Sequence, residues 1–297
     1  MKQTQKEWAR YIQDEIKKND SYDNYKHAFI EYKDYLEKCL LENPRDVEKV
    51  CQLAAVYNEL NYQWDDIYKL LNEFIKKYEN ELTDEEKSRI YTNLGFYYDD
   101  QRYGSKRAIR TLRKAVAFNP NNSKAYYGLG ADYYGAGKYD KSEEMYKRAC
   151  ELKDNPIYKF EYANLLMVNG KNEEAKIILE ELIKKDFEFG KEDFAKIKYS
   201  YIANKIQLKE FENIEDEINE LMLEMVNKDD FFEEEFAELY YLVGSYEKSR
   251  KIYSKLKIQD YQFPAWWLRF YFYSLKQLNE IEKLLRDSKG ILNKYNF

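Results

Sequence analysis

The chain has 297 residues, a net charge of −6 at neutral pH, and only ten glycines and four prolines. Proteins on average carry these two residues at about 12% of positions, and sandwiches, barrels and propellers need them for tight turns. The composition therefore argues against such folds and against nucleotide-binding α/β folds with a glycine-rich loop. With 44% hydrophobic and 35% charged residues, the sequence is typical of a helix-rich soluble protein, and its acidic balance argues against nucleic acid as a partner.

The first elements in chain order are two helices, predicted at residues 5–18 and 22–43, which end at Pro44. A series of helical pairs follows, in which apolar residues recur with a spacing of about 3.6 residues. The pairs are predicted to begin at residues 47, 88, 123, 156, 195, 230 and 262.

Two adjacent pairs share a sequence motif. Residues 91–98 read Tyr-x-x-Leu-Gly-x-x-Tyr, and residues 126–133 repeat the same pattern. A small residue, Ala108 or Ser142, follows in the second helix of each pair. A pattern that recurs in neighbouring units is much more specific than a single motif, and it is the signature of a repeat protein.

This pattern resembles the tetratricopeptide repeat (TPR) of bacterial proteins, a helix–turn–helix unit of 34 residues. The resemblance implies an all-α protein, a right-handed α-solenoid of about seven such repeats after an N-terminal helical pair. The implied parts are a cap at 1–46, a repeat array at 47–261, and a divergent repeat or cap at 262–297. The clearest units are residues 88–122, 123–155, 156–189 and 230–261.

Small residues occupy one fixed position in the first helix of each pair, where a bulkier side chain would wedge the two helices apart. These residues are Ala54, Gly95, Gly130, Ala163 and Ala237. Each pair has two apolar faces and is expected to stack on its neighbours. The 31 tyrosines and 16 phenylalanines are expected to fill the stacking layers.

No catalytic or metal-binding pattern is evident. The single histidine, His27, lacks the set of positioned partners that catalysis requires. The glycine-rich run 128–138 has Tyr133 and Ala136 where nucleotide loops need Gly and Lys. Its glycines suit helix packing at Gly130 and an inter-helix turn at Gly137. We therefore expect no enzyme activity, no cofactor and no metal site.

The cysteines and the N-terminus predict a location. Cys39, Cys51 and Cys150 are odd in number and far apart, which predicts neither a disulfide framework nor a zinc site. The N-terminal residues have no apolar stretch like that of a secretory signal, and no segment is suited to span a bilayer. We expect a cytoplasmic protein that does not enter a membrane.

The resemblance also implies a concave groove lined by the first helices of the units. The side chains that it places in this groove are Arg89, Asn93, Phe96, Asp99, Lys124, Tyr127, Tyr134, Phe160, Asn164 and Met167. Aromatic rings and amides together suit an extended or helical peptide.

Some members of the family grip the C-terminal carboxylate of a partner with two lysines, two asparagines and an arginine. Here Asn93 and Lys124 occupy two of these five positions. The other three hold Cys51, Ala55 and Gly128, which cannot make the contacts. The resemblance therefore does not predict a terminal carboxylate as the ligand.

Charge is unevenly distributed along the chain. Residues 102–116 contain six bases and no acid, whereas residues 210–238 contain thirteen acids and one base. Such runs are usually solvated faces. As an alternative, the segment 210–238 attracts a basic partner, and Arg107, Arg110 and Lys114 on one helix face attract an acidic one.

The sequence favours a non-catalytic scaffold that binds a protein or peptide segment in its groove. Two alternatives are a cytoplasmic inhibitor, such as an immunity protein that neutralises a basic toxin, and a peptide-sensing regulator. The short segment before the first repeat argues against a DNA-binding output domain. The aromatic residues around Trp266 and Trp267 are either a buried cap or an exposed interaction patch.

Overall fold

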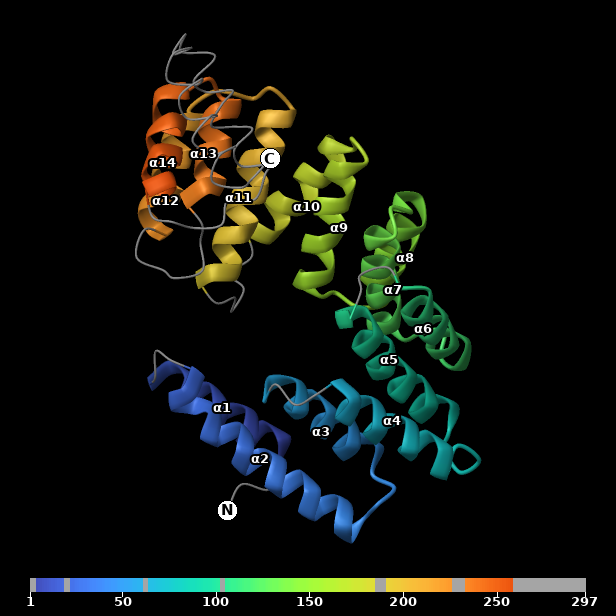
Figure 1. Cartoon of the computed structure of the whole chain (residues 1–297). Coiled ribbons are helices and arrows are strands. Elements are labelled where there is room, and N and C mark those ends of the chain that lie inside the picture. Colours follow the sequence, from blue (N-terminus) through green and yellow to red (C-terminus); the bar gives the residue numbers. More distant parts are fainter. Residues whose placement is uncertain are drawn as a thin grey trace, which may run out of the picture. The chain divides into compact units, whose positions relative to one another are not determined.

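The computed structural model describes residues 4–18, 22–60, 64–101, 105–184, 191–225 and 233–258. These ranges hold fourteen α-helices, and no strand occurs within them (Figure 1). The prediction of an all-α protein built from helical pairs is therefore confirmed. The predicted last repeat at 262–297, with Trp266 and Trp267, lies outside the described residues.

The chain divides into two compact units, Met1–Tyr158 and Lys159–Phe297. The first unit contains α1 (Gln5–Lys18), α2 (Tyr22–Glu42), α3 (Val47–Glu59), α4 (Trp64–Tyr78), α5 (Asp84–Gln101), α6 (Lys106–Phe118), α7 (Ser123–Gly135) and α8 (Tyr139–Leu152). The helix α9 (Pro156–Val168) begins in the first unit and continues into the second. The second unit then contains α10 (Asn172–Lys184), α11 (Lys191–Gln207), α12 (Ile214–Met225), α13 (Glu233–Leu242) and α14 (Tyr246–Ile258).

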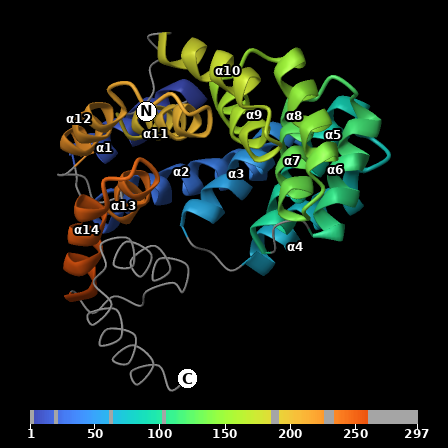
Figure 2. The same cartoon turned by 90° about the horizontal axis from the view of Figure 1, so that it is seen from above.

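In the first unit, α3 packs on α4, α5 on α6, and α7 on α8. The first helices of these pairs also contact one another, α3 with α5 and α5 with α7. The helices α5 to α8 lie side by side in both views (Figures 1 and 2). The helices α3, α5 and α7 thus form one layer, and this layer carries the candidate site.

The core of the first unit follows the predicted apolar stripe. Tyr91, Leu94 and Tyr98 on α5 are all buried, together with Ile90 and Leu71. Burying a side chain of this size stabilises the fold by roughly 1.5–3 kcal/mol. The tyrosines of this stripe therefore pack between helices, as predicted.

The small residues of the first helices permit close helix packing, as predicted. A Cβ atom added to Gly95 would lie 2.5 Å from Cγ of Leu112 on α6. Between α7 and α8, the hydroxyl of Ser142 donates a hydrogen bond to the carbonyl of Gly130 at 2.7 Å. Gly137 has a φ of 68°, the left-handed conformation that the turn between these helices requires.

The start of α5 differs from the predicted unit boundary at residue 88. The backbone N–H of Thr83 donates to Oε2 of Glu86 at 2.8 Å, and the N–H of Glu86 donates to Oγ1 of Thr83 at 3.2 Å. This reciprocal capping box begins the helix at Asp84. The extra turn adds Glu85 to the face of α5 that lines the groove.

In the second unit, consecutive helices from α10 to α14 pack on one another. One core cluster surrounds Ile218 and Ala237, and another surrounds Ala163 and Leu179. The first helices α11 and α13 begin at Lys191 and Glu233, whereas the predicted unit starts are residues 195 and 230. No helix in the described part of the chain has the length and apolarity needed to cross a bilayer.

Candidate functional site

Three neighbouring cavities with shared lining residues lie along the layer of α3, α5 and α7 in the first unit, and we call them together the groove. The central cavity has a volume of about 480 Å³ and shares Glu48, Glu85 and Arg89 with a second cavity of about 490 Å³. It shares Ala55, Asn93 and Lys124 with a third cavity of about 150 Å³. The groove therefore continues on both sides of its central cavity.

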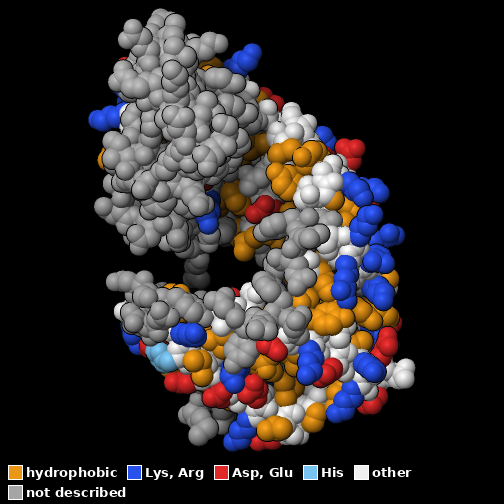
Figure 3. Space-filling model, viewed as in Figure 1, with side chains coloured by type: hydrophobic (Ala, Val, Ile, Leu, Met, Phe, Trp, Pro, Cys, Tyr) orange, Lys and Arg blue, Asp and Glu red, His pale blue; other side chains and the backbone are white. Residues whose placement is uncertain are grey.

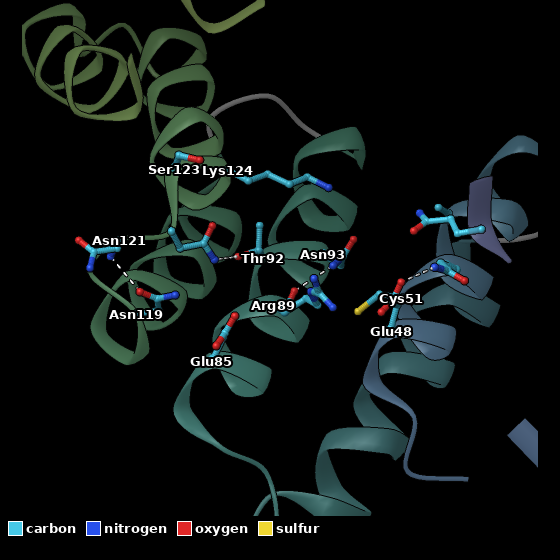
Figure 4. Close-up of a pocket in the computed structure, with 14 residues that line it drawn as sticks. Glu48, Cys51, Glu85, Arg89, Thr92, Asn93, Asn119, Asn121, Ser123 and Lys124 are labelled. Atoms are coloured by element: carbon cyan, nitrogen blue, oxygen red, sulfur yellow. Dashed lines mark hydrogen bonds between the residues drawn. The ribbon is translucent and has the colours of Figure 1, made fainter. Parts of the chain in front are cut away.

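The central cavity is lined mainly by polar and charged side chains (Figure 4). Arg89 and Asn93 lie one turn apart on α5 and so share one helix face. In Figure 4, Lys124 extends from the first turn of α7 toward α5. The opposite wall is α3, with Glu48 and Cys51.

Positive charge in this cavity has no counter-ion. Neither Arg89 nor Lys124 forms an ion pair with any described residue. The ammonium of Lys124 lies 5.2 Å from the centre of the Phe96 ring. Partial removal from water lowers the pKa of Lys124 below its ordinary 10.5, and repulsion from Arg89 and Lys153 adds to this effect. An anion placed here would relieve that repulsion.

Cys51 forms the neutral part of the same wall. Burial raises the pKa of its thiol to about 12, and the positive charges of Arg89 and Lys124 offset this only in part. At neutral pH the thiol is therefore protonated and a poor nucleophile. Cys51 contributes shape to the cavity rather than chemistry.

Amide side chains supply hydrogen-bonding groups along the central cavity. Asn93 donates to the carbonyl of Arg89 at 2.9 Å, and its Oδ1 accepts no hydrogen bond from a described residue. The side chain of Asn121, in the loop before α7, makes no hydrogen bond within the described part of the chain. These groups can pair with the backbone of a bound segment.

Asn122 is held in place by the protein itself. Its Oδ1 accepts the N–H of Ala125 at 3.0 Å and so caps α7. Its Nδ2 donates to the hydroxyls of Ser88 at 2.8 Å and Thr92 at 2.9 Å. These bonds fix the first turn of α7, and with it Lys124, relative to α5.

The smallest of the three cavities is lined mainly by apolar side chains, with Asn58, Asn93 and Lys124 at its edge. It lies between Ala54 and Ala55 on α3, Leu71 on α4, and Phe96 and Tyr97 on α5. The small side chains of the two alanines leave this space open. A cavity of about 150 Å³ accommodates a group the size of benzene, so this one can take a single apolar side chain.

The cavity at the other end is charged. Arg45 lies 3.7 Å from Glu86 and 3.9 Å from Glu81, so its charge is already balanced. Hydrogen bonds from the Thr83 backbone hold the pKa of Glu86 below its usual value. Glu48 and Glu85 also line this cavity and form no ion pair with a described residue.

The predicted groove residues fall into four groups. Arg89, Asn93, Phe96 and Lys124 line the cavities and are brought together. Tyr127 instead stacks on Tyr158 at 4.7 Å, and Tyr134, 46% exposed, packs against Tyr139 at 5.6 Å. Neither of these tyrosines lines the three cavities. The side chain of Asp99 lies outside the described ones.

The other three predicted residues, Phe160, Asn164 and Met167, lie on α9 within the second unit. Phe160 and Met167 pack against the core that contains Ala163 and Leu166. Their role in a groove stays a prediction.

Several lining residues were missed by the sequence analysis. The repeat positions cover only the first helices of each pair, whereas Asn119 and Asn121 lie in the loop between α6 and α7. The signal available for them is the polar run Asn-Pro-Asn-Asn at 119–122. Glu85 was missed because the predicted unit began at residue 88.

The outer face of the first unit carries exposed positive charge. Lysine and arginine side chains gather over α6 in Figure 3, and Lys106, Arg110 and Arg113 are exposed. Arg107 is also exposed, but its guanidinium lies 4.2 Å from the centre of the Tyr98 ring and donates to the hydroxyl of Tyr68 at 2.9 Å. It therefore also packs α6 against its neighbours.

The acidic segment 210–238 is partly neutralised within the second unit. Ion pairs join Glu210 to Lys176 at 2.7 Å, Glu215 to Lys248 at 2.6 Å, Glu217 to Lys205 at 2.5 Å, and Glu224 to Lys198 at 2.8 Å. Four of the thirteen acids thus pair with lysines on α10, α11 and α14. Residues 226–232 lie outside the described ones.

The single histidine lies on the surface of the first unit. The Nε2 atom of His27 lies 3.5 Å from Glu15 on the exposed surface. Within the described ranges, no group of three or more His, Cys, Asp or Glu side chains is arranged to hold a metal ion.

Comparison with known proteins places the fold. No protein-family model matches the chain, and no curated protein sequence matches it. Among solved structures, a tetratricopeptide repeat protein from Parabacteroides merdae is similar over 91% of this chain and 98% of its own, with 12% identity and a TM-score of 0.53.

Two further structures are similar over 72% of this chain and 94% of theirs. They are PilF from Pseudomonas aeruginosa, with 19% identity and a TM-score of 0.54, and BtubC from P. vanneervenii, with 13% identity and a TM-score of 0.57. The chain thus has the tetratricopeptide-repeat fold, as the sequence motif predicted.

Proposed function

We propose that this protein is a non-catalytic, cytoplasmic scaffold that binds an extended segment of another protein in the groove of α3, α5 and α7. The observation that carries the proposal is a row of three neighbouring cavities that offers amide groups with free hydrogen-bonding atoms, cations without an ion-pair partner and a mainly apolar pocket. Such a surface can bond the backbone of an extended chain and receive its side chains separately.

The fold supports this reading without fixing it, since one fold serves many functions. Repeat arrays expose long surfaces for binding. The buried, protonated thiol of Cys51 and the surface position of His27 offer no activated nucleophile or base in the groove.

Affinity capture from the source cell tests the proposal. The full-length protein and the variant Asn93→Ala/Phe96→Ala are used as baits, with Lys106→Ala/Arg113→Ala on α6 as a matched control. We expect one set of partners to be lost with the groove variant and retained with the control, at equal helicity by circular dichroism. Equal capture by all three baits would reject the groove as the binding site.

The inhibitor alternative depends on free acidic charge in the segment 210–238. Ion pairs already use four of these acids, and the pKa of Glu215 is lowered by Lys248 and Ser245. The groove therefore supports the scaffold reading better. The peptide-sensing reading uses the same groove and is distinguished by the identity of the captured partner.

A further inference from the structure

We propose that the bound segment places an internal acidic residue between Arg89 and Lys124, with an apolar side chain on its Phe96 side and a basic side chain on its Glu85 side. This inference rests on the proposed function, because it names the chemistry of the segment that the groove would hold. It specifies an order of side chains, apolar–acidic–basic, along the groove.

The acidic position follows from the charges that surround Lys124. Burial lowers the pKa of Lys124, and the cations Arg89 and Lys153 lower it further, while the Cys51 thiol beside them is neutral. Glu48 and Glu85 form no ion pair with Arg89, although they line the same cavity. A carboxylate that accepts hydrogen bonds from both Arg89 and Lys124 would turn this repulsion into attraction.

The internal position follows from the cavities on both sides of the central one. The mainly apolar cavity adjoins the central cavity and shares Ala55, Asn93 and Lys124 with it. The charged cavity also adjoins it and shares Glu48, Glu85 and Arg89. A chain that ended at its carboxylate would leave one of these flanking cavities unfilled. A segment that continues in both directions fills all three.

The two flanking preferences follow from the lining residues. Leu71, Phe96 and the two alanines of α3 offer apolar contacts alone. At the other end, Arg45 pairs with Glu81 and Glu86. Glu48 and Glu85 form no ion pair there and would attract a cation, while Arg89 lies where this cavity meets the central one. Reversing the segment would place its basic side chain against Phe96 and its apolar one among the acids, which disfavours the reversed direction.

Selection from a random peptide library tests the order. Twelve-residue random peptides are displayed within a loop of a carrier protein, so that no free terminus is available, and are selected on the full-length protein. We expect enrichment of an acidic residue with an apolar residue on one side and Lys or Arg on the other. Enriched peptides without an acidic residue would overturn the inference.

A binding measurement tests the two cations. One enriched peptide is synthesised with both ends blocked and titrated by fluorescence anisotropy against the wild-type protein and the variants Arg89→Gln and Lys124→Gln. Each variant should weaken binding about tenfold or more, since a charge-assisted hydrogen bond is lost. The control Arg113→Gln removes the same charge from α6 and should change the affinity less than twofold. Equal losses in variant and control would overturn the inference.

A shortened peptide separates an internal carboxylate from a terminal one. The same peptide is cut directly after its apolar residue–acid pair, with either a free or an amidated end. We expect both shortened forms to bind more weakly than the full peptide, because the charged cavity is left empty. Tighter binding of the free-acid form than of the full peptide would overturn the internal position.

The outcomes also separate the inference from the proposed function. Enriched peptides that lose affinity for Phe96→Ala but show no acidic preference would leave the proposed function standing and reject the inference. Absence of any enrichment, or binding that is unchanged in Phe96→Ala, would reject both.

Discussion

The ring of Tyr146 on α8 lies directly against Gly130 on α7, where a Cβ atom would stand 2.6 Å from Cδ1 of the ring. The two helices can approach this closely only because Gly130 has no side chain. Ser142 reinforces the contact through its bond to the Gly130 carbonyl. This pair of helices positions the first turn of α7, which carries Lys124.

Replacing Gly130 by Ala should therefore destabilise the first unit. Alanine raises intrinsic helix stability by up to about 1 kcal/mol, but overpacking a tight contact costs typically 1–3 kcal/mol. We expect a net loss of free energy of unfolding, measured by urea denaturation.

A second background identifies the cause of that loss. In a Tyr146→Leu protein the ring is absent, so Gly130→Ala should cost less than it does in the wild type. Equal costs in the two backgrounds would show that contact with Tyr146 is not what excludes a side chain at Gly130.

Lys124 should titrate below its ordinary pKa of 10.5, because of desolvation and its two cationic neighbours. NMR of its labelled side chain reports this pKa directly. Arg89→Gln removes one repelling charge and should raise the value. An unchanged pKa in Arg89→Gln would contradict the like-charge arrangement in the groove.

The same shift has a consequence for stability. The unfolded chain holds the Lys124 proton more tightly than the folded protein, so the stability of the wild type relative to Lys124→Gln should increase with pH toward 10.5. Denaturation of both proteins between pH 8 and 10.5 measures this difference. A relative stability that falls over this range would contradict the sign of the shift.

The capping box at the start of α5 should contribute measurably to stability. Thr83→Ala removes the side-chain acceptor for the Glu86 N–H and should cost about 1 kcal/mol. Glu86 has a lowered pKa, so its contribution should be lost as the pH falls through that value. The variant Glu85→Gln, which alters the same turn outside the box, serves as the control in thermal denaturation across pH 3–7.

The helical pairs were predictable because their signals are local and periodic. Apolar residues at 3.6-residue spacing mark the buried faces, and small residues such as Gly95 and Gly130 mark the crossings between helices. The boundary of α5 was less predictable, because the capping box of Thr83 and Glu86 starts the helix before its apolar stripe begins.

The candidate site was predictable only in part. Arg89, Asn93, Phe96 and Lys124 follow from repeat positions, which fix the face of a helix. Tyr127 does not line the cavities because its ring stacks on Tyr158, a tertiary contact that helix periodicity does not encode. The loop residue Asn121 was missed for a similar reason, since loop geometry depends on how α6 meets α7.

Site-directed photo-crosslinking in the source cell tests the central claim most directly. A benzophenone amino acid replaces Asn93 in the groove or Arg113 on the outer face of α6, in otherwise unchanged full-length protein. The account predicts that position 93 forms a covalent adduct with another protein, that Phe96→Ala in the same protein abolishes it, and that position 113 forms none. An adduct at position 113 with none at position 93 would contradict binding in the groove.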